Sequence, residues 1–204
     1  MELYDTEEQQ VEAIKDWWKE NGKAVMLGAV IGLGGLFGWR FYQDSVTEAK
    51  EAASEAYTQA ILSLSSKGID ASGDVQSFID GNKDTEYSVL AAMQLAKVQI
   101  EAGNLDEALA QLEWAKSTTK DAALKPVITL RVARVQAEQG DFEAALAELN
   151  NITEEGWAGR VAELRGDISL RKGDTAAAYA AYTEAQQATD ASQTLQIKLD
   201  DLAK

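Results

Sequence analysis

The chain has 204 residues, of which 34 are acidic and 19 basic, and its formal net charge at pH 7 is −15. It contains no cysteine and no histidine, which excludes disulfide bonds, thiol nucleophiles, histidine general bases and nearly every kind of zinc site. The acidic balance argues against nucleic-acid binding, which needs clustered lysine and arginine. We therefore expect no catalytic residue, no metal and no cofactor, and hold a hydrolase that uses serine, lysine or carboxylate groups as an open alternative.

The N-terminal segment has helical periodicity. Val11, Ile14 and Trp18 recur at a spacing that places them on one face of a helix over residues 7–20. Acidic residues are frequent on the remaining surface of this segment. We expect residues 1–22 to form a short, acidic, amphipathic helix on the cytoplasmic side of a membrane.

The next segment has the composition of a membrane span. Between Lys23 and Arg40 lie sixteen residues without a charge, five of them glycine. They cover about 24 Å of helix, and the flanking aromatic residues extend this toward the hydrocarbon thickness of about 30 Å. Because each glycine costs a water-soluble helix up to about 1 kcal/mol, we predict a transmembrane helix over residues 23–42. A buried core helix and a cleaved signal peptide are the alternatives, although no small-residue cleavage site follows the apolar run.

The charges around this segment predict its orientation. Three lysines, Lys15, Lys19 and Lys23, precede it closely, and two cations, Arg40 and Lys50, follow it. Cytoplasmic flanks carry the excess of positive charge, so three cations against two slightly favour a cytoplasmic N-terminus, the orientation that the family resemblance given below also implies.

Small residues in the span form a stripe. Ala24, Gly28, Gly32 and Gly35 follow helical spacing, and such a face lets a second membrane helix approach closely. We predict helix packing there, with ordinary lipid-facing small residues as the alternative.

Beyond the span the sequence repeats itself. The segments 103–108, 140–145 and 173–178 each begin with glycine followed by Asn or Asp, and they recur after 37 and 33 residues. This is the period of a tetratricopeptide repeat, a helix–turn–helix unit of about 34 residues. Helix-forming residues dominate and no alternating β-pattern is present. We expect an all-α fold, in which one N-terminal transmembrane helix precedes a tetratricopeptide-repeat-like α-solenoid over residues 43–204; an unrelated helical bundle is the alternative.

The repeat positions predict the details of each turn. The glycines should adopt the left-handed conformation, and the residues after them should cap the second helices. The third repeat departs from the others, because Arg165-Gly166 stands where the first two repeats have a large–small pair. A C-terminal helix should cap the open end of the solenoid. The expected helices are residues 45–65, 75–79, 86–102, 105–118, 126–139, 142–150, 158–172, 175–188 and 191–203, with a loop over 66–73.

Solenoids of this kind bind partners on the concave surface made by the first helix of each repeat. Lys97 and Arg134 are equivalent positions in the first two repeats, and they suit an extended or helical peptide with acidic and apolar residues. The alternative is that these cations pair with neighbouring carboxylates. Trp114 and Trp157 are interpreted as packing residues. The candidate partner-binding residues are Met93, Lys97, Ile100, Leu130, Arg134 and Arg160.

Several local sequences resemble the YfgM family, the ancillary subunit of the bacterial Sec translocon. They are Trp17-Trp18-Lys-Glu-Asn21-Gly-Lys23 and Gly38-Trp39-Arg40 around the span, and Leu130-Arg-Val-Ala-Arg134-Val-Gln136, Glu155-Gly-Trp157 and Leu164-Arg-Gly-Asp167 in the repeats. The order and spacing of these sequences carry the resemblance over essentially the whole chain.

The resemblance implies a single-pass protein of the bacterial inner membrane whose C-terminal domain lies in the periplasm. It implies a non-catalytic role in protein–protein interaction at the SecYEG translocon. The implied partners are SecYEG, a membrane-anchored periplasmic chaperone, emerging polypeptides and, through one span, membrane lipid. The alternative function is a membrane-tethered scaffold or stress-response regulator that acts through its cytoplasmic N-terminal helix.

Overall fold

The computed structural model describes residues 7–202, and it divides the chain into two compact units, Met1–Ala52 and Ala53–Lys204. Within the described residues all regular structure is helical and there is no β-strand. This confirms the all-α fold class. The first six residues of the predicted N-terminal segment and the last residues of the predicted C-terminal helix lie outside the described range.

The first unit contains most of a single long helix, α1 (Glu7–Lys67). We expected separate helices before and after the span, but α1 is continuous, because no proline and no strong break separates the three segments. In the described range, one segment is long and apolar enough to cross a membrane, and none of its apolar window is buried. A core helix of a soluble protein buries such residues, so the exposed window favours the membrane-span interpretation over the buried-core alternative.

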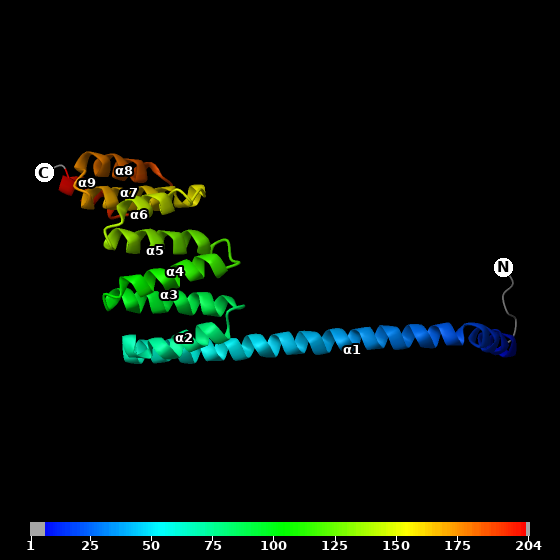
Figure 1. Ribbon diagram of the computed structural model, residues 1–204. Coiled ribbons are helices and arrows are strands. Elements are labelled where there is room, and N and C mark those ends of the chain that lie inside the picture. Colours follow the sequence, from blue (N-terminus) through cyan, green and yellow to red (C-terminus); the bar gives the residue numbers. More distant parts are fainter. Residues whose placement is uncertain (1–6, 203–204) are drawn as a thin grey trace. The chain divides into compact units, whose positions relative to one another are not determined.

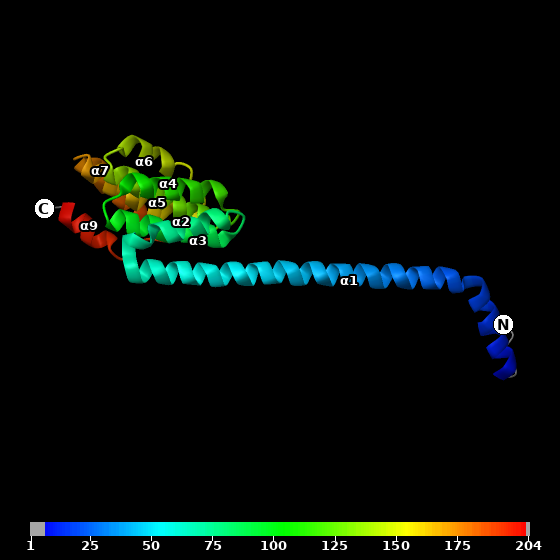
Figure 2. The same cartoon turned by 60° about the horizontal axis from the view of Figure 1, so that its bottom comes forward.

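The N-terminal end of α1 is bent relative to the rest of the helix (Figure 2, dark blue). Asn21 and Gly22, two weak helix formers, lie in this part of α1. The Asn21 side chain donates a hydrogen bond to the carbonyl of Trp17 at 3.0 Å. The indole of Trp18 covers Gly22 so closely that an added Cβ would lie 3.3 Å from the ring. Both residues weaken the helix locally, because glycine and asparagine are poor helix formers.

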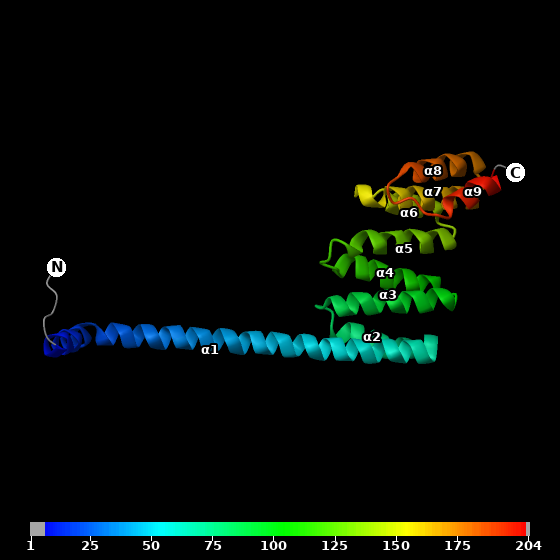
Figure 3. The same cartoon turned by 180° about the vertical axis from the view of Figure 1, so that it is seen from behind.

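The second unit begins with the last part of α1 and continues as stacked helices (Figures 1 and 3). Three antiparallel pairs, α3–α4, α5–α6 and α7–α8, follow the order of the predicted repeats. The expected loop over residues 66–73 is wrong: a 3₁₀ turn joins α1 directly to α2. The elements are η1 (Gly68–Ala71), α2 (Ser72–Gly81), α3 (Glu86–Glu101), α4 (Leu105–Thr118), α5 (Leu124–Glu138), α6 (Phe142–Leu149), η2 (Glu155–Trp157), α7 (Ala158–Arg171), α8 (Thr175–Gln187) and α9 (Leu195–Leu202).

The turns within the repeats follow the predicted chemistry with one exception. Their glycines have φ values of 84°, 86° and 83° at residues 103, 140 and 173, which confirms the left-handed conformation. Asp141 and Asp174 accept hydrogen bonds from the third backbone N–H of the following helix and so cap α6 and α8. Asn104 makes no such bond. Its turn relies instead on the backbone, with the Asn104 N–H bonded to the carbonyl of Gln99 at 2.8 Å.

The unusual third repeat is explained by a compensating pair. Gly166 occupies the position of Ala96 and Ala133 in the earlier repeats, and Tyr182 occupies the position of a leucine. A Cβ on Gly166 would lie 2.4 Å from the Tyr182 ring, so the ring fills the space that alanine has in the other repeats. Tyr182 is 1% exposed. The third repeat therefore differs from the others in a compensating way: the smaller residue at position 166 makes room for the larger one at position 182.

The C-terminal helix α9 covers the end of the solenoid. Leu195 and Leu199 are buried in a cluster with Tyr182 and the alanines of α8. Lys198 reaches back to α7, where its ammonium lies 2.8 Å from Glu163 and 2.6 Å from Asp167. These contacts confirm that α9 caps the third repeat.

Candidate partner-binding groove

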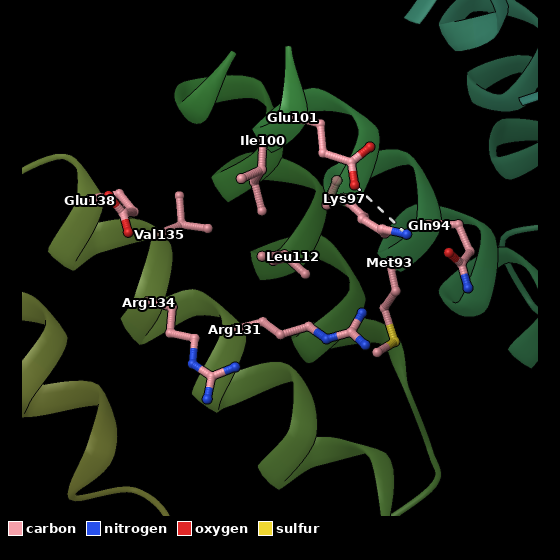
Figure 4. Close-up of a pocket in the computed structure, with 11 residues that line it drawn as sticks. Met93, Gln94, Lys97, Ile100, Glu101, Leu112, Arg131, Arg134, Val135 and Glu138 are labelled. Carbon is pink, nitrogen blue, oxygen red and sulfur yellow. Dashed lines mark ion pairs between the residues drawn. The ribbon is translucent and has the colours of Figure 1, made fainter. Parts of the chain in front are cut away.

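A hollow of about 370 Å³ lies where the first helices of the first two repeats face each other. Helices α3 and α5 form its walls, and Leu112 of α4 lies at its base (Figure 4). The lining residues are Met93, Gln94, Ala96, Lys97, Ile100, Glu101, Leu112, Arg131, Arg134, Val135 and Glu138. We call this surface the groove.

The groove continues toward the third repeat. A second hollow of about 210 Å³ lies between α5 and α7, and it shares Arg134 and Glu138 with the first. Asp167 and Arg171 of α7 complete its polar lining. The surface therefore passes over three consecutive first helices, as expected for a repeat solenoid.

The structure brings together four of the six candidate residues. Met93, Lys97, Ile100 and Arg134 all line the groove, and Ile100 is the most exposed apolar side chain among them, at 36%. Met93 is only 6% exposed, so most of its side chain belongs to the core and little of it faces the hollow.

The other two candidates lie elsewhere. Leu130 packs into the cluster of buried residues between α5, α6 and α7, and it is 6% exposed. Arg160 lies in the first turn of α7, where its guanidinium stacks over the indole of Trp157 at 4.9 Å. Neither residue lines the groove, because Leu130 is buried against α6 and α7 and Arg160 is stacked on Trp157.

Most charges along the groove are paired with one another. Lys97 lies 3.7 Å from Glu101 on the same helix, as the local-pairing alternative predicts. Glu138 binds Arg171 of the next repeat. The hydrogen bond from Arg171 holds the pKa of Glu138 below its ordinary value. Asp167 is held by Lys198.

Two arginines are different. Among residues 9–202, whose side chains the structure describes, Arg131 and Arg134 have no carboxylate within ion-pair distance. Both come from α5, three positions apart, and both guanidinium groups are visible at the groove in Figure 4. Local pairing thus accounts for Lys97 but not for Arg134.

Arg131 lines the groove but is not among the candidate residues predicted from the sequence. It occupies the position of Gln94 in the first repeat, so a comparison of repeats gives no sign of a conserved charge there. The available signal was its spacing of three residues from Arg134 on one helix, which places the two guanidinium groups on the same face.

The two tryptophans of the repeat domain are packing residues, as interpreted. Trp114 lies against the cluster of buried residues around α3 and α4, and Trp157 lies against the cluster around α6 and α7. Both are partly buried.

The small residues of the span have room for a neighbour. Gly28, Gly32 and Gly35 have no atom within 4 Å of the position of an added Cβ, and Ala24 is exposed beside them. Their role in helix packing stays a prediction. Elsewhere in the described range, no group of three or more carboxylates is placed to hold a metal ion.

These features define the class of the molecule: a tetratricopeptide-repeat-like protein in which a helix ahead of the repeats is long and apolar enough to cross a membrane. The tetratricopeptide repeat-like domain family matches residues 15–204.

Proteins named "Ancillary SecYEG translocon subunit" are similar to this chain over its full length. The one from Escherichia coli (strain K12) is 39% identical over 207 residues, and the alignment covers 100% of this chain and 100% of that protein. The one from Haemophilus influenzae is 35% identical over 198 residues, which are 96% of this chain and 97% of that protein. The chain belongs to the YfgM family of ancillary SecYEG translocon subunits, which confirms the resemblance. Its homologues, repeat fold and apolar helix indicate a membrane-anchored, non-catalytic adaptor.

Proposed function

We propose that this chain is a membrane-anchored interaction module of the Sec translocon. Its span holds it beside the channel through the stripe of small residues, with residues 1–22 in the cytoplasm and residues 43–204 in the periplasm. The repeat domain binds a membrane-anchored periplasmic chaperone and contacts emerging polypeptides. The names of the relatives support the association with SecYEG.

The observation that carries the binding role is the pair of unpaired arginines in the groove. Residues 41–204 contain 27 acidic and 15 basic residues, a net charge of −12, so a cationic site is unusual on this surface. Arg131 and Arg134 therefore favour a partner segment that brings carboxylates. Ile100, next to them, adds apolar contact area for a neighbouring side chain.

Anchoring compensates for weak binding. A groove of this size makes few contacts, and several of its charges are already neutralised by pairing. Attachment to the membrane raises the effective concentration of the groove near a membrane-bound partner, so a modest intrinsic affinity is sufficient.

The test is copurification of SecYEG and of membrane-anchored chaperones with the full-length chain in mild detergent. The double change Arg131→Glu and Arg134→Glu should reduce capture of the chaperone. It should leave capture of SecYEG intact, because in this proposal the span, and not the groove, contacts SecYEG. The matched control is Lys83→Glu with Lys120→Glu, which makes the same change in charge on exposed residues outside the groove. Equal chaperone capture by the two double variants would contradict the role of the groove.

Two further variants separate the span from the N-terminal helix. Replacing residues 24–39 by an apolar sequence without glycine should release SecYEG if the small-residue stripe packs against it. Deleting residues 1–20 should leave both partners bound. If that deletion alone abolished function while the groove arginines were dispensable, the scaffold or regulator alternative would replace this proposal.

A further inference from the structure

We propose that the N-terminal part of α1, residues 9–20, lies in the interface of the membrane with its apolar face in the lipid. The inference goes beyond the proposed function, because it concerns a surface that neither the span nor the groove uses. Its occupant is the phospholipid bilayer itself.

The first observation is an exposed apolar face within the first unit. Val11, Ile14, Trp17 and Trp18 gather on one side of this helix, and between 50% and 67% of each residue is exposed. In water four such residues on three turns of helix would be unfavourable. Tryptophan suits the interface in particular, because its ring is apolar and its N–H remains within reach of headgroups and water.

The second observation is that Trp18, at the end of the apolar face, lies beside the first turns of the span. Trp18 covers Gly22, and both line a hollow of about 520 Å³ together with Met26, Leu27 and Val30. These last three residues belong to the span. Lys19 and Lys23 lie at the same hollow, where their ammonium groups can reach the phosphate level. If the span lies in lipid, as the proposed function has it, Trp18 lies at the boundary between lipid and water, and the apolar face that it belongs to is held next to the bilayer.

The bend gives the helix the direction that this placement needs. A straight α1 would carry the N-terminal residues away from the membrane along the axis of the span. The bend instead turns them aside from that axis (Figure 2), within the same compact unit as the span. The bent part of α1 thus has the direction of an interfacial helix that leads into a transmembrane helix.

The charges allow the placement on a neutral membrane. From Gln9 to Lys23 the segment has three acidic and three basic residues, so its net charge is zero. Lys19 also pairs with Asp16 at 3.1 Å, on the side opposite Ile14 and Trp17. Binding should therefore depend on apolar contact and hardly on anionic lipid, unlike that of basic amphipathic helices.

The chain contains no cysteine, so single-cysteine variants of the full-length protein allow a direct test. Val11→Cys, Ile14→Cys, Glu12→Cys and Asp16→Cys would each be spin-labelled and reconstituted in liposomes of phosphatidylcholine alone. Collision rates with oxygen and with a water-soluble nickel chelate then report the surroundings of each label. We expect a higher oxygen-to-nickel ratio at positions 11 and 14 than at positions 12 and 16.

A second pair of variants tests the cause. In the Val11→Cys background, Ile14→Asp places a charge at the centre of the apolar face, and the label at position 11 should become accessible to nickel. Asp16→Asn, on the polar face, should leave it protected. Nickel access at all four positions would overturn the proposal, and so would protection of positions 11 and 14 that arises only when SecYEG is added to the liposomes. Either result leaves the proposed function standing, because that rests on copurification.

Discussion

At the scale of single residues, the third repeat shows how a packing site tolerates an exchange that looks unfavourable in sequence. Gly166 and Tyr182 replace the alanine and leucine of the first two repeats, and the ring lies 2.4 Å from where a Cβ of residue 166 would be. The hydroxyl of Tyr182 also donates a hydrogen bond to Asp167 at 2.7 Å. The two residues therefore form one unit, and changing either alone should be costly.

This coupling is testable with a double-mutant cycle. Gly166→Ala should destabilise the repeat domain by about 1–3 kcal/mol, the usual cost of overpacking a filled core. Tyr182→Leu should also destabilise it, through a cavity and the lost hydrogen bond. The double variant restores the alanine–leucine pair, so its cost should be clearly smaller than the sum of the single costs. Urea unfolding of the full chain in detergent, followed by circular dichroism, measures all three. Additive costs would show that the sites are independent.

Lys198 gives a second residue-level prediction, concerning pH. Burial alone would lower the pKa of this ammonium, but its hydrogen bonds to Asp167 and Glu163 outweigh burial and raise the pKa above the ordinary value. A raised pKa means that the folded state binds the proton more tightly, so the stabilisation is complete below the unfolded pKa of about 10.4 and is lost as pH rises through the folded value.

Lys198→Met should therefore lower the free energy of unfolding by a constant amount at neutral pH. We expect about 1–2 kcal/mol, between the values of exposed and buried ion pairs, since about a third of the Lys198 side chain is exposed. The difference from the wild type should shrink only at strongly alkaline pH. Urea titrations at neutral and alkaline pH test this, and a difference that instead grew with rising pH would contradict the assigned sign.

At the scale of whole elements, removal of α9 should destabilise mainly the repeat next to it. In a repeat protein each unit contacts only its neighbours, so the loss of a cap weakens the adjacent repeat first. Ending the chain after Gln193 removes α9 but keeps Asp190, whose carboxylate accepts hydrogen bonds from the first backbone N–H groups of α7.

Hydrogen exchange should show this gradient. In the shortened chain the amides of α7 and α8 should exchange faster, because Tyr182 and its alanine neighbours lose the cover of Leu195 and Leu199. The amides of α3 and α4, two repeats away, should exchange as in the full chain. Mass spectrometry of peptic fragments measures both regions at once, and uniformly faster exchange would mean that the domain unfolds as one cooperative unit.

The same scale shows what the sequence could and could not predict. The helices from α3 to α8 match their expected bounds within two residues at each end, because glycine turns and capping aspartates act locally. The loop expected over 66–73 was wrong. Two glycines there are typical of a loop, but Ala71 and Val75 pack into the core, and the segment is helical. In the groove the prediction was partly right. Lys97 and Arg134 line the hollow, whereas Leu130 is buried against α6 and α7 and Arg160 stacks on Trp157, two contacts that no local sequence pattern records.

At the scale of the whole molecule, the two units should differ in the solvent that they need. Residues 53–204 bury their apolar side chains in their own clusters, whereas Leu27, Val30, Ile31, Leu36 and Phe37 each remain more than 60% exposed. Transferring such surface from water to lipid is worth about 25 cal/mol per Å², so the first unit should be insoluble without a membrane and the second soluble alone.

Fractionation of cells with alkaline carbonate separates these properties. The full-length chain should remain in the membrane pellet, and a chain that begins at residue 43 should appear in the supernatant. Replacing Val30 and Ile31 by lysine should release the full-length chain, because two charges at the bilayer centre cost about 5–7 kcal/mol. The matched control replaces the exposed Ile197 and Leu170 of the repeat domain by lysine and should stay in the pellet. If the unaltered chain itself left the membrane, its apolar helix would not be an anchor, and its place beside a translocation channel would lose its physical basis.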